Sequence, residues 1–300
     1  MVKVFAPGSI GNVGPGFDVL GLAVEGIGDI VTMEESSETS IEIFGRDAEI
    51  IPTDPKLNTV SIAAKALMDR YKVSKNISIK LDRSLPSSGG LGASAASSVA
   101  GALAAAAIIE TAVDQADIIE AALVAETAVA GRHLDNIAPC VFGGLSIVQS
   151  DHPIKIYSVP VQLDVTILLV TPNIKIKTKD SREVLPQKLK QSDWVKQLAN
   201  TATLVNAFST GDLMMLRDGL QDHYGEVFRS PLIPGFNEAK SLAMSHNALG
   251  FSISGAGPTC FAMFEDKEDA ELCAKEMPDV FVDGCSTHLG SIAKQGARIL

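Results

Sequence analysis

The sequence has 300 residues, of which 46% are hydrophobic and 20% charged, a composition that excludes disordered, collagen-like and coiled-coil proteins. With 25 basic and 36 acidic residues the net charge is −11, which disfavours nucleic acids and anionic membranes as partners. Four cysteines without a CxxC pair give no zinc or disulfide framework, and no apolar stretch reaches the length of a membrane span. We therefore expect a soluble cytoplasmic protein of about two domains.

Short strands and helices alternate through the first half of the sequence. Period-two alternation and short apolar runs predict strands at Val2–Phe5, Val19–Val24, Ile30–Met33, Ile41–Phe44 and Ile77–Leu81. Apolar residues at helical spacing, or long runs of small residues, predict helices at Leu57–Tyr71, Ala93–Glu110 and Gln115–Val129.

The second half repeats this mixture, so the fold class is mixed α and β. Strands are predicted at Val165–Val170, Phe251–Ser254, Cys260–Phe264 and Val280–Val282. Helices are predicted at Asp193–Phe208, Leu213–Leu220, Asn237–His246 and Asp266–Met277. Residues 173–192 are rich in Lys and Gln and are predicted to be the least ordered segment. A domain boundary is expected between residues 150 and 165, which gives domains of residues 1–155 and 156–300.

A glycine-rich turn between a predicted strand and a predicted helix, Pro86–Ala96, is the first candidate site. Its glycines let backbone N–H groups approach a ligand, and the following helix N-terminus attracts anions. Ser94 adds a hydroxyl for a metal or a phosphate. A plain turn with small residues for close packing accounts for the pattern equally well. The sequence has no Gly-Lys pair, which excludes a P-loop, and its dinucleotide-binding glycine pattern is incomplete.

A second glycine-rich segment, Pro7–Asp18, contains four glycines and two prolines and is predicted to form a fixed, tight loop. It presents Asn12 and Asp18, and an aspartate held in this way could receive a substrate amine. The simpler interpretation of Asp18 is a solvated loop aspartate.

Polar residues also gather after the helix predicted to end at residue 129. Glu126 on that helix could hold Mg²⁺, and the following segment Gly131–Pro139 is predicted to be a turn. Within it, Asp135 or Asn136 could meet a substrate hydroxyl. His133, taken alone, is more simply a surface or capping histidine.

One further segment and two arginines are weak evidence for a site when each is taken singly. Ser252–Thr259 combines a strand, a glycine turn and another strand, and could bring its backbone near the first loop or simply form a β-hairpin. Arg182 and Arg229 could bind a carboxylate through two parallel hydrogen bonds, although each alone is more simply an exposed arginine.

In this combination the sequence resembles the GHMP small-molecule kinases, and among them the branch that acts on homoserine. The resemblance rests on four motifs that span nearly the whole chain: Asn12–Ala23, Pro86–Ala96, His133–Pro139 and Gly255–Pro258. It implies an α+β fold of two domains. The N-terminal domain would be like ribosomal protein S5 domain 2, and the C-terminal domain would be ferredoxin-like.

The resemblance also implies ATP and Mg²⁺, with Ser94 and Glu126 as metal ligands and Asn58 near the nucleoside. The loop that would bind ATP consists of Pro86, Ser87, Ser88, Gly89, Gly90, Leu91, Gly92, Ala93, Ser94, Ala95 and Ala96. A homodimer is the expected assembly, with no nucleic-acid or membrane partner.

For the substrate, the resemblance implies that Asp18 meets the ammonium group of L-homoserine and that Arg182 and Arg229 meet its carboxylate. Asn136 would hold the hydroxyl, with Asn12 and His133 completing the pocket. The expected catalytic residues are Asn136, Asp135, Glu126 and Ser94. Asp135 lies where a base would be sought, but positioning and electrostatics carry most of phosphoryl transfer, so our hypothesis is that no base is essential.

Two alternatives remain. One is a GHMP kinase for mevalonate or a sugar, substrates that lack the α-amine that Asp18 would bind. The other is a GHMP-like protein that senses a ligand without catalysis, against which the presence of Ser94, Glu126 and the full glycine loop argues.

Overall fold

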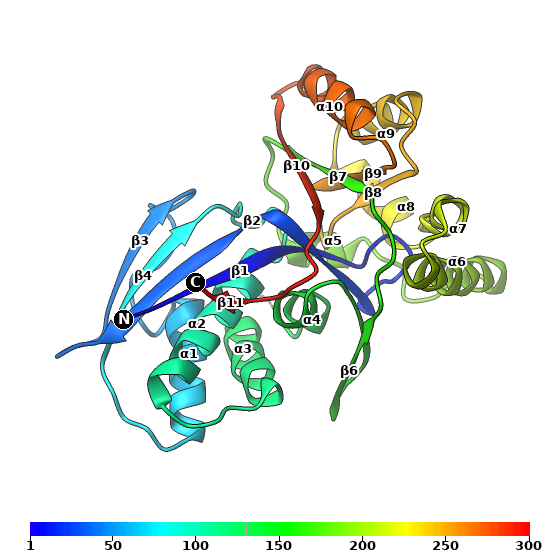
Figure 1. The fold of residues 1–300 in the computed structure, drawn as a ribbon. Coiled ribbons are helices and arrows are strands. Elements are labelled where there is room, and N and C mark those ends of the chain that lie inside the picture. Colours follow the sequence, from blue (N-terminus) through cyan, green and yellow to red (C-terminus); the bar gives the residue numbers. More distant parts are fainter. Residues whose placement is uncertain (130) are drawn as a thin grey trace.

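The computed structural model describes residues 1–129 and 131–300, and its described strands form one continuous sheet. The main path of the sheet follows the order β11-β1-β2-β10-β7-β9-β8. Helices cover this sheet in two separate groups, one on each half of the molecule (Figure 1). The two halves therefore share a backbone hydrogen-bond network rather than being joined only by a linker.

The first half is built around two long strands, β1 (Val2–Gly11) and β2 (Leu20–Glu35). One edge of β2 pairs with β1, and the register shifts between Pro7 and Gly8. The other edge pairs in turn with three further strands. These are β5 (Leu145–Asp151), β10 (Cys285–Ile292) and β4 (Ile77–Arg83). β3 (Ser40–Gly45) runs parallel to β4, and β6 (Ile154–Val159) pairs with β5.

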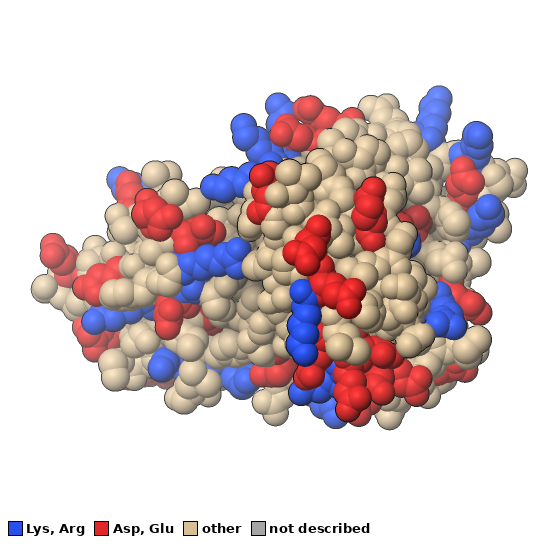
Figure 2. Space-filling model, turned by 90° about the horizontal axis from the view of Figure 1, so that it is seen from above, with Lys and Arg blue, Asp and Glu red and all other residues tan. Residues whose placement is uncertain are grey.

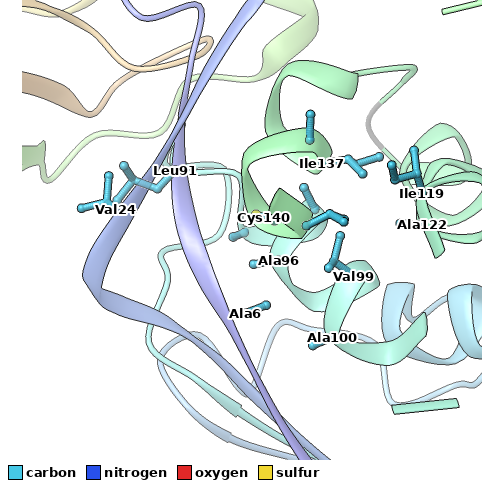
Figure 3. Packing of buried hydrophobic residues seen from close by; sticks show 14 of the residues in the cluster. Ala6, Val24, Leu91, Ala96, Val99, Ala100, Ile119, Ala122, Ile137 and Cys140 are labelled. Atoms are coloured by element: carbon cyan, nitrogen blue, oxygen red, sulfur yellow. The ribbon is translucent and has the colours of Figure 1, made fainter. Parts of the chain in front are cut away.

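Four helices pack on one face of this half of the sheet. They are α1 (Thr59–Arg70), α2 (Ala93–Ile109), α3 (Gln115–Val129) and α4 (Leu134–Phe142). α2 lies directly on β1 and β2, and α1 and α3 pack against it. Because α2 is made mostly of alanine, neighbouring backbones approach it closely, and a Cβ on Gly101 would lie 2.4 Å from the carbonyl of Val60. Figure 3 shows this alanine-rich packing between α2, α3 and α4.

The second half has its own sheet segment and core. β10 pairs with β7 (Thr166–Pro172), which pairs with β9 (Cys260–Phe264), and β8 (Gly250–Ile253) lies beyond β9. α9 (Phe236–Ser245) and α10 (Lys267–Glu276) cover one face and bury an apolar cluster that includes Phe236, Phe251 and Phe264. The 3₁₀ turn Met277–Val280 follows α10.

Five further helical segments lie between β7 and α9 in the chain. They are α5 (Thr178–Glu183), α6 (Gln191–Thr210), α7 (Leu213–Gly219), α8 (Gly225–Arg229) and the 3₁₀ turn Ser230–Leu232. β11 (Arg298–Ile299) returns to pair with β1. Among the described helices, none has the length and apolar character needed to cross a membrane.

Several sequence predictions are wrong in instructive ways. Residues 20–24 and Ile30–Met33 are parts of the single strand β2, because the register shift between Pro7 and Gly8 skips residues 25–27, including Gly26, without ending the strand; Val19 lies just before it. Val280–Val282 is not a strand: Val282 is 99% exposed and pairs with nothing among the described residues. Residues 173–192, predicted to be the least ordered segment, contain α5, where the Ser181 hydroxyl donates to the carbonyl of Ala256 (2.7 Å).

The segment Gly131–Pro139 is also more regular than predicted, because residues 134–142 form α4. Its buried residues Leu134, Ile137, Ala138 and Val141 have the i, i+3, i+4, i+7 spacing of a helix. The domain boundary near residue 155 stays a prediction.

Candidate active site

Three glycine-rich segments that are far apart in the sequence meet at one place. Asn12 Nδ2 donates to the carbonyl of Gly255 (2.8 Å), and the N–H of Gly255 donates to the carbonyl of Gly11 (3.0 Å). The Ser254 hydroxyl donates to the carbonyl of Gly90 (2.6 Å), so the turn at residues 252–259 also holds the glycine-rich loop at residues 86–96. The prediction that the 252–259 turn approaches the first loop is confirmed, and the turn also joins β8 to β9 as a hairpin.

These segments border a cleft of about 700 Å³. Nearly all of the predicted site residues line it, namely Asn12, Asp18, Asn58, Pro86–Gly90, Gly92–Ser94, Glu126, His133, Asp135, Asn136, Arg182 and Arg229. Three residues of the predicted ATP loop do not line the cleft. The side chains of Leu91, Ala95 and Ala96 are buried in the hydrophobic core, because they anchor the loop and the first turn of α2.

The glycine-rich loop takes a backbone path that side chains would block. Gly90 and Gly92 have positive φ angles of 84° and 61°. A Cβ on Gly92 would lie 2.0 Å from Ser9 Oγ, and one on Gly90 would lie 2.4 Å from the carbonyl of Ser254. The loop leads into α2, and the first N–H groups of this helix have no acceptor within the helix. This end of α2 borders the cleft, since Gly92, Ala93 and Ser94 line it. This arrangement suits an anionic ligand such as a phosphate.

Ser94 and Glu126 form the polar pair next to this loop. The Ser94 hydroxyl donates to Glu126 Oε1 (2.9 Å), while Glu126 Oε2 is buried without a hydrogen-bond partner among the described residues. Burial, and to a lesser extent the charge of Asp135, raise the pKa of Glu126 to about 7, although the hydrogen bond from Ser94 opposes this. A buried carboxylate oxygen without a partner beside a hydroxyl fits a hard cation such as Mg²⁺.

The loop between β1 and β2 is held in an unusual backbone conformation. Asn12, Val13 and Asp18 have positive φ angles of 67°, 46° and 54°. Asn12 stabilises this shape because its Oδ1 accepts from the N–H of Asp18 (3.0 Å) while its Nδ2 donates to Gly255. Conformations of this kind cluster at functional sites. The amide of Asn12 therefore orients Asp18, and its oxygen is already used within the protein.

Asp18 forms an ion pair with Arg182 across the cleft. Arg182 Nη2 donates to Asp18 Oδ1 (2.7 Å) and Nη1 to Oδ2 (3.1 Å), a two-bond arrangement. Arg182 Nη2 also lies 3.1 Å from His133 Nδ1. Ligand atoms of Asp18, His133 and Asp135 lie within 4.8 Å of one another, but the guanidinium group already supplies a positive charge to this cluster.

Asp135 and Asn136 lie side by side on the first turn of α4. The Ser9 hydroxyl donates to Asn136 Oδ1 (3.0 Å), which fixes the orientation of this amide. Asp135 is 4% exposed. Burial and then the charge of Asp18 raise the pKa of Asp135 to about 7, and Arg182 partly counteracts this. Burial therefore disfavours the charged form of Asp135.

Arg229 is the last residue of α8, and only 3% of it is exposed. The simpler interpretation of Arg229 as an exposed arginine is therefore wrong. Its Nε donates to the carbonyl of Ser181 (3.1 Å) and its Nη1 to that of Gly255 (2.9 Å). The ring of Phe17 lies 5.2 Å from the guanidinium of Arg229 and 5.5 Å from that of Arg182. These contacts hold two positive groups near each other at one end of the cleft.

The sequence interpretation gave Asn58 a place near a ligand, but its side chain is already engaged. Its Oδ1 accepts from the N–H of Val60 (3.0 Å) as the N-cap of α1, and its Nδ2 donates to the carbonyl of Pro52 (2.8 Å). Other residues that line the cleft escaped prediction, namely Ile50–Pro52, Leu57, Thr59, Arg83, Val129 and Lys177–Lys179. Lysine at every second position from 175 to 179 is the sequence pattern that could have indicated a role for residues 177–179 in the cleft.

Comparison with known families agrees with this geometry. The model for the GHMP kinases N terminal domain matches residues 58–144, and the model for GHMP kinases C terminal matches residues 204–283. The chain therefore has the domain pair that defines the GHMP class of kinases. It is 38% identical to the homoserine kinase of Pyrococcus abyssi over 275 residues, 91% of each protein. It is also 33% identical to that of Chloroherpeton thalassium, over 100% of this chain and 99% of the relative. The chain belongs to the homoserine kinase family.

Solved structures lead to the same family. The crystal structure of homoserine kinase from Cytophaga hutchinsonii has a TM-score of 0.93 and 34% identity, covering 100% of this chain and 97% of that one. Mevalonate kinase from L. major, with a TM-score of 0.76 and 15% identity, shares the fold alone. The predicted two-domain GHMP kinase fold is thus confirmed, and the protein is a kinase.

Proposed function

We propose that the protein transfers the γ-phosphoryl group of ATP to the side-chain hydroxyl of L-homoserine, giving O-phospho-L-homoserine for threonine synthesis. One observation carries this proposal. A single cleft joins a glycine loop and the Ser94–Glu126 pair to a group of charged residues made of Asp18, Arg182 and Arg229. The first set suits a nucleotide phosphate with its metal, and the second suits a small zwitterion.

At the nucleotide end, the backbone of Gly89–Gly92 and the N-terminus of α2 would bind the phosphates of ATP. Ser94 and Glu126 would hold Mg²⁺, since the buried Glu126 Oε2 lacks a partner and both residues offer oxygen ligands. When bound, Mg²⁺ neutralises charge on the phosphate oxygens during transfer. Asn58 shapes the wall of this end through its bonds to Val60 and Pro52.

At the other end, Asp18 would receive the ammonium group of the substrate, and Arg182 and Arg229 its carboxylate. In the ligand-free protein Asp18 and Arg182 neutralise each other. A zwitterionic amino acid would replace this pair by one ion pair to each of its own charges. Mevalonate and sugars carry no ammonium group, so they would leave Asp18 without a partner, and this favours an amino-acid substrate.

Asn136 would bind the hydroxyl that accepts the phosphoryl group, since Ser9 fixes its amide near the glycine loop. Phosphoryl transfer passes through a loose transition state, so positioning and electrostatics carry most of the catalysis. We infer that Asp135 balances part of the charge of Arg182, although burial keeps the pKa of Asp135 above its usual range, and that Asp135 is not an essential base.

Asp135→Asn is therefore expected to keep kcat within about 10-fold of the unmodified enzyme, because the neutral amide retains the shape of the site. Asn136→Ala provides the comparison and is expected to lower kcat further, because the acceptor hydroxyl loses its positioning contact. Steady-state kinetics with saturating L-homoserine and MgATP measures both. A loss of about 10⁴-fold in Asp135→Asn, with unchanged KM values, would show that Asp135 is the base.

The proposed activity is tested by coupled ADP release with MgATP, comparing L-homoserine with mevalonate, galactose and L-threonine. Turnover that depends on L-homoserine is the expected result. Turnover on another alcohol would keep the nucleotide end and overturn the roles of Asp18, Arg182 and Arg229. Nucleotide binding without turnover on any alcohol would favour the non-catalytic ligand sensor.

We also propose a cytoplasmic enzyme that forms a homodimer and uses no nucleic-acid or membrane partner. Figure 2 shows acidic side chains spread over this face, with the largest group along its lower edge, while basic side chains stand singly or in short rows. With a net charge of −11, this distribution disfavours polyanions. Light scattering coupled to size-exclusion chromatography measures the assembly.

A further inference from the structure

We propose that Gln197 on α6 is a positioning residue that sets the spacing between the amine-binding and carboxylate-binding sides of the homoserine pocket. This inference rests on the proposed function, which supplies the roles of Asp18 and Arg229. Gln197 does not line the cleft, so any effect on the substrate must pass through the residues that it holds.

The side-chain amide of Gln197 bonds to two separate segments. Its Nε2 donates to the carbonyl of Pro15 (2.9 Å) and to Asp222 Oδ1 (2.8 Å). Its Oε1 accepts from the N–H of His223 (2.8 Å). Two acceptors face the nitrogen and one donor faces the oxygen, so only one orientation of the amide satisfies all three bonds. No other residue type of this length offers the same set of groups.

Each of these segments carries one side of the pocket. Pro15 lies in the strained loop that presents Asp18, and Thr201, one helical turn beyond Gln197, also donates to its carbonyl (3.1 Å). Asp222 lies three residues before α8, the short helix that ends at Arg229. Its carboxylate accepts from three successive N–H groups at the start of that helix, those of Tyr224, Gly225 and Glu226.

The two sides are also joined at a second point. The carbonyl of Gly255 accepts from Asn12 Nδ2 (2.8 Å) and from Arg229 Nη1 (2.9 Å). With this link alone, the loop and the helix could rotate about Gly255. The contacts of Phe17 with Tyr224 and Arg229 would restrain that rotation only weakly, because aromatic contacts tolerate sliding. Gln197 supplies directional bonds at the other end of both segments and so fixes their relative position.

The spacing matters because an α-amino acid carries its ammonium and carboxylate groups on one carbon. Groups that bind both charges must therefore keep one separation, and a displacement of 1 Å weakens binding strongly. Loss of Gln197 is expected to weaken recognition of the amino acid. It should leave the nucleotide end unchanged, since none of the hydrogen bonds of Gln197 reaches the glycine loop or the Ser94–Glu126 pair.

The experiment compares Gln197→Ala with Asn206→Ala, which lies on the same helix and donates to Met215 Sδ (3.1 Å) on α7. Gln197→Ala is expected to raise KM for L-homoserine about 10-fold, below the ~100-fold that a 1 Å misplacement can cause. KM for ATP should stay within about 2-fold, and Asn206→Ala should change neither constant. Thr201→Val is a milder variant that removes the Thr201 hydroxyl, which contacts both the carbonyl of Pro15 and that of Gln197 (2.7 Å), and a smaller shift in the same direction is expected.

Circular dichroism and thermal melting establish that each variant is folded. An unchanged KM for L-homoserine in folded Gln197→Ala, or equal increases in both KM values, would overturn the positioning role. If Gln197→Ala does not fold, Thr201→Val decides by the same split between KM values. Absence of homoserine-dependent turnover in the unmodified enzyme would instead overturn the proposed function, so the two failures are distinct.

Discussion

Glu126→Gln is expected to lower kcat by about 100- to 1000-fold, as happens when a group that stabilises transition-state charge is removed. Glutamine keeps the shape of the side chain and its contact with Ser94, but it loses the negative charge that would hold Mg²⁺. Steady-state kinetics at several Mg²⁺ concentrations measures the loss. Full activity in the variant would remove Glu126 from the metal site.

The same substitution is expected to stabilise the ligand-free protein at pH 8. Because burial raises the folded-state pKa of Glu126 to about 7, the folded protein holds this proton more tightly than the unfolded chain does. The stabilisation from that proton is present below about pH 4.5 and is lost as the pH rises through 7. The cost of the ionised carboxylate at pH 8 is on the order of 3 kcal/mol, and glutamine removes it.

Thermal melting in EDTA between pH 5 and pH 8 measures this effect. The unmodified protein should lose more stability across this range than Glu126→Gln does. Glu120→Gln is the matched control, because Glu120 lies on the same helix in an exposed ion pair with Arg70 and such pairs contribute little. Equal pH dependence in the unmodified protein and Glu126→Gln would contradict the raised pKa.

Arg182→Ala is expected to raise KM for L-homoserine by about 100-fold, because a substrate carboxylate would lose a charged hydrogen-bond partner worth about 3 kcal/mol. KM for ATP should change little. The melting temperature should also change little. The ion pair between Asp18 and Arg182 is partly solvated, with side chains 43% and 37% exposed, and such pairs contribute at most about 1 kcal/mol.

Arg132→Ala is the control for Arg182→Ala. Arg132 lies 3.6 Å from Asp151 in an exposed ion pair, so its removal takes away a positive charge without touching the cleft contacts described above. An unchanged KM for L-homoserine in Arg182→Ala would exclude Arg182 from the pocket.

Asp18→Ala should abolish the use of L-homoserine as a substrate. Unchanged activity of Asp18→Ala would favour a substrate without an ammonium group.

Much of the site could be predicted because its loops are short and need glycine at particular positions, which is visible in the sequence. The glycines at 90 and 92 occur where a Cβ would collide with Ser254 or Ser9, so their pattern carries information about the fold. Helices with strong apolar periodicity were also found closely, and α3 matches its predicted range of Gln115–Val129.

Contacts between distant residues could not be predicted in this way. Nothing local indicates that Asp18 and Arg182 form an ion pair across 164 residues, or that Asn58, which lines the cleft, also caps α1. α4 was hidden because Pro139 inside it suggests a turn, although burial of Leu134 and Ile137 favours the helix. The hydrogen-bond partners of Gln197 are also far from it in the sequence, so no local pattern indicated the role of this residue.

The return of β10 and β11 to the first half has a consequence for synthesis on the ribosome. β10 lies between β2 and β7, β11 covers part of β1, and the N–H of Leu300 donates to the carbonyl of Lys3 (2.8 Å). Until translation passes residue 299, the nascent chain keeps open strand edges on β1 and β2, and such edges pair readily with other chains. Emerging chains are therefore most prone to aggregate late in translation, when the glycine-rich segments are already made but the sheet that supports them is still incomplete.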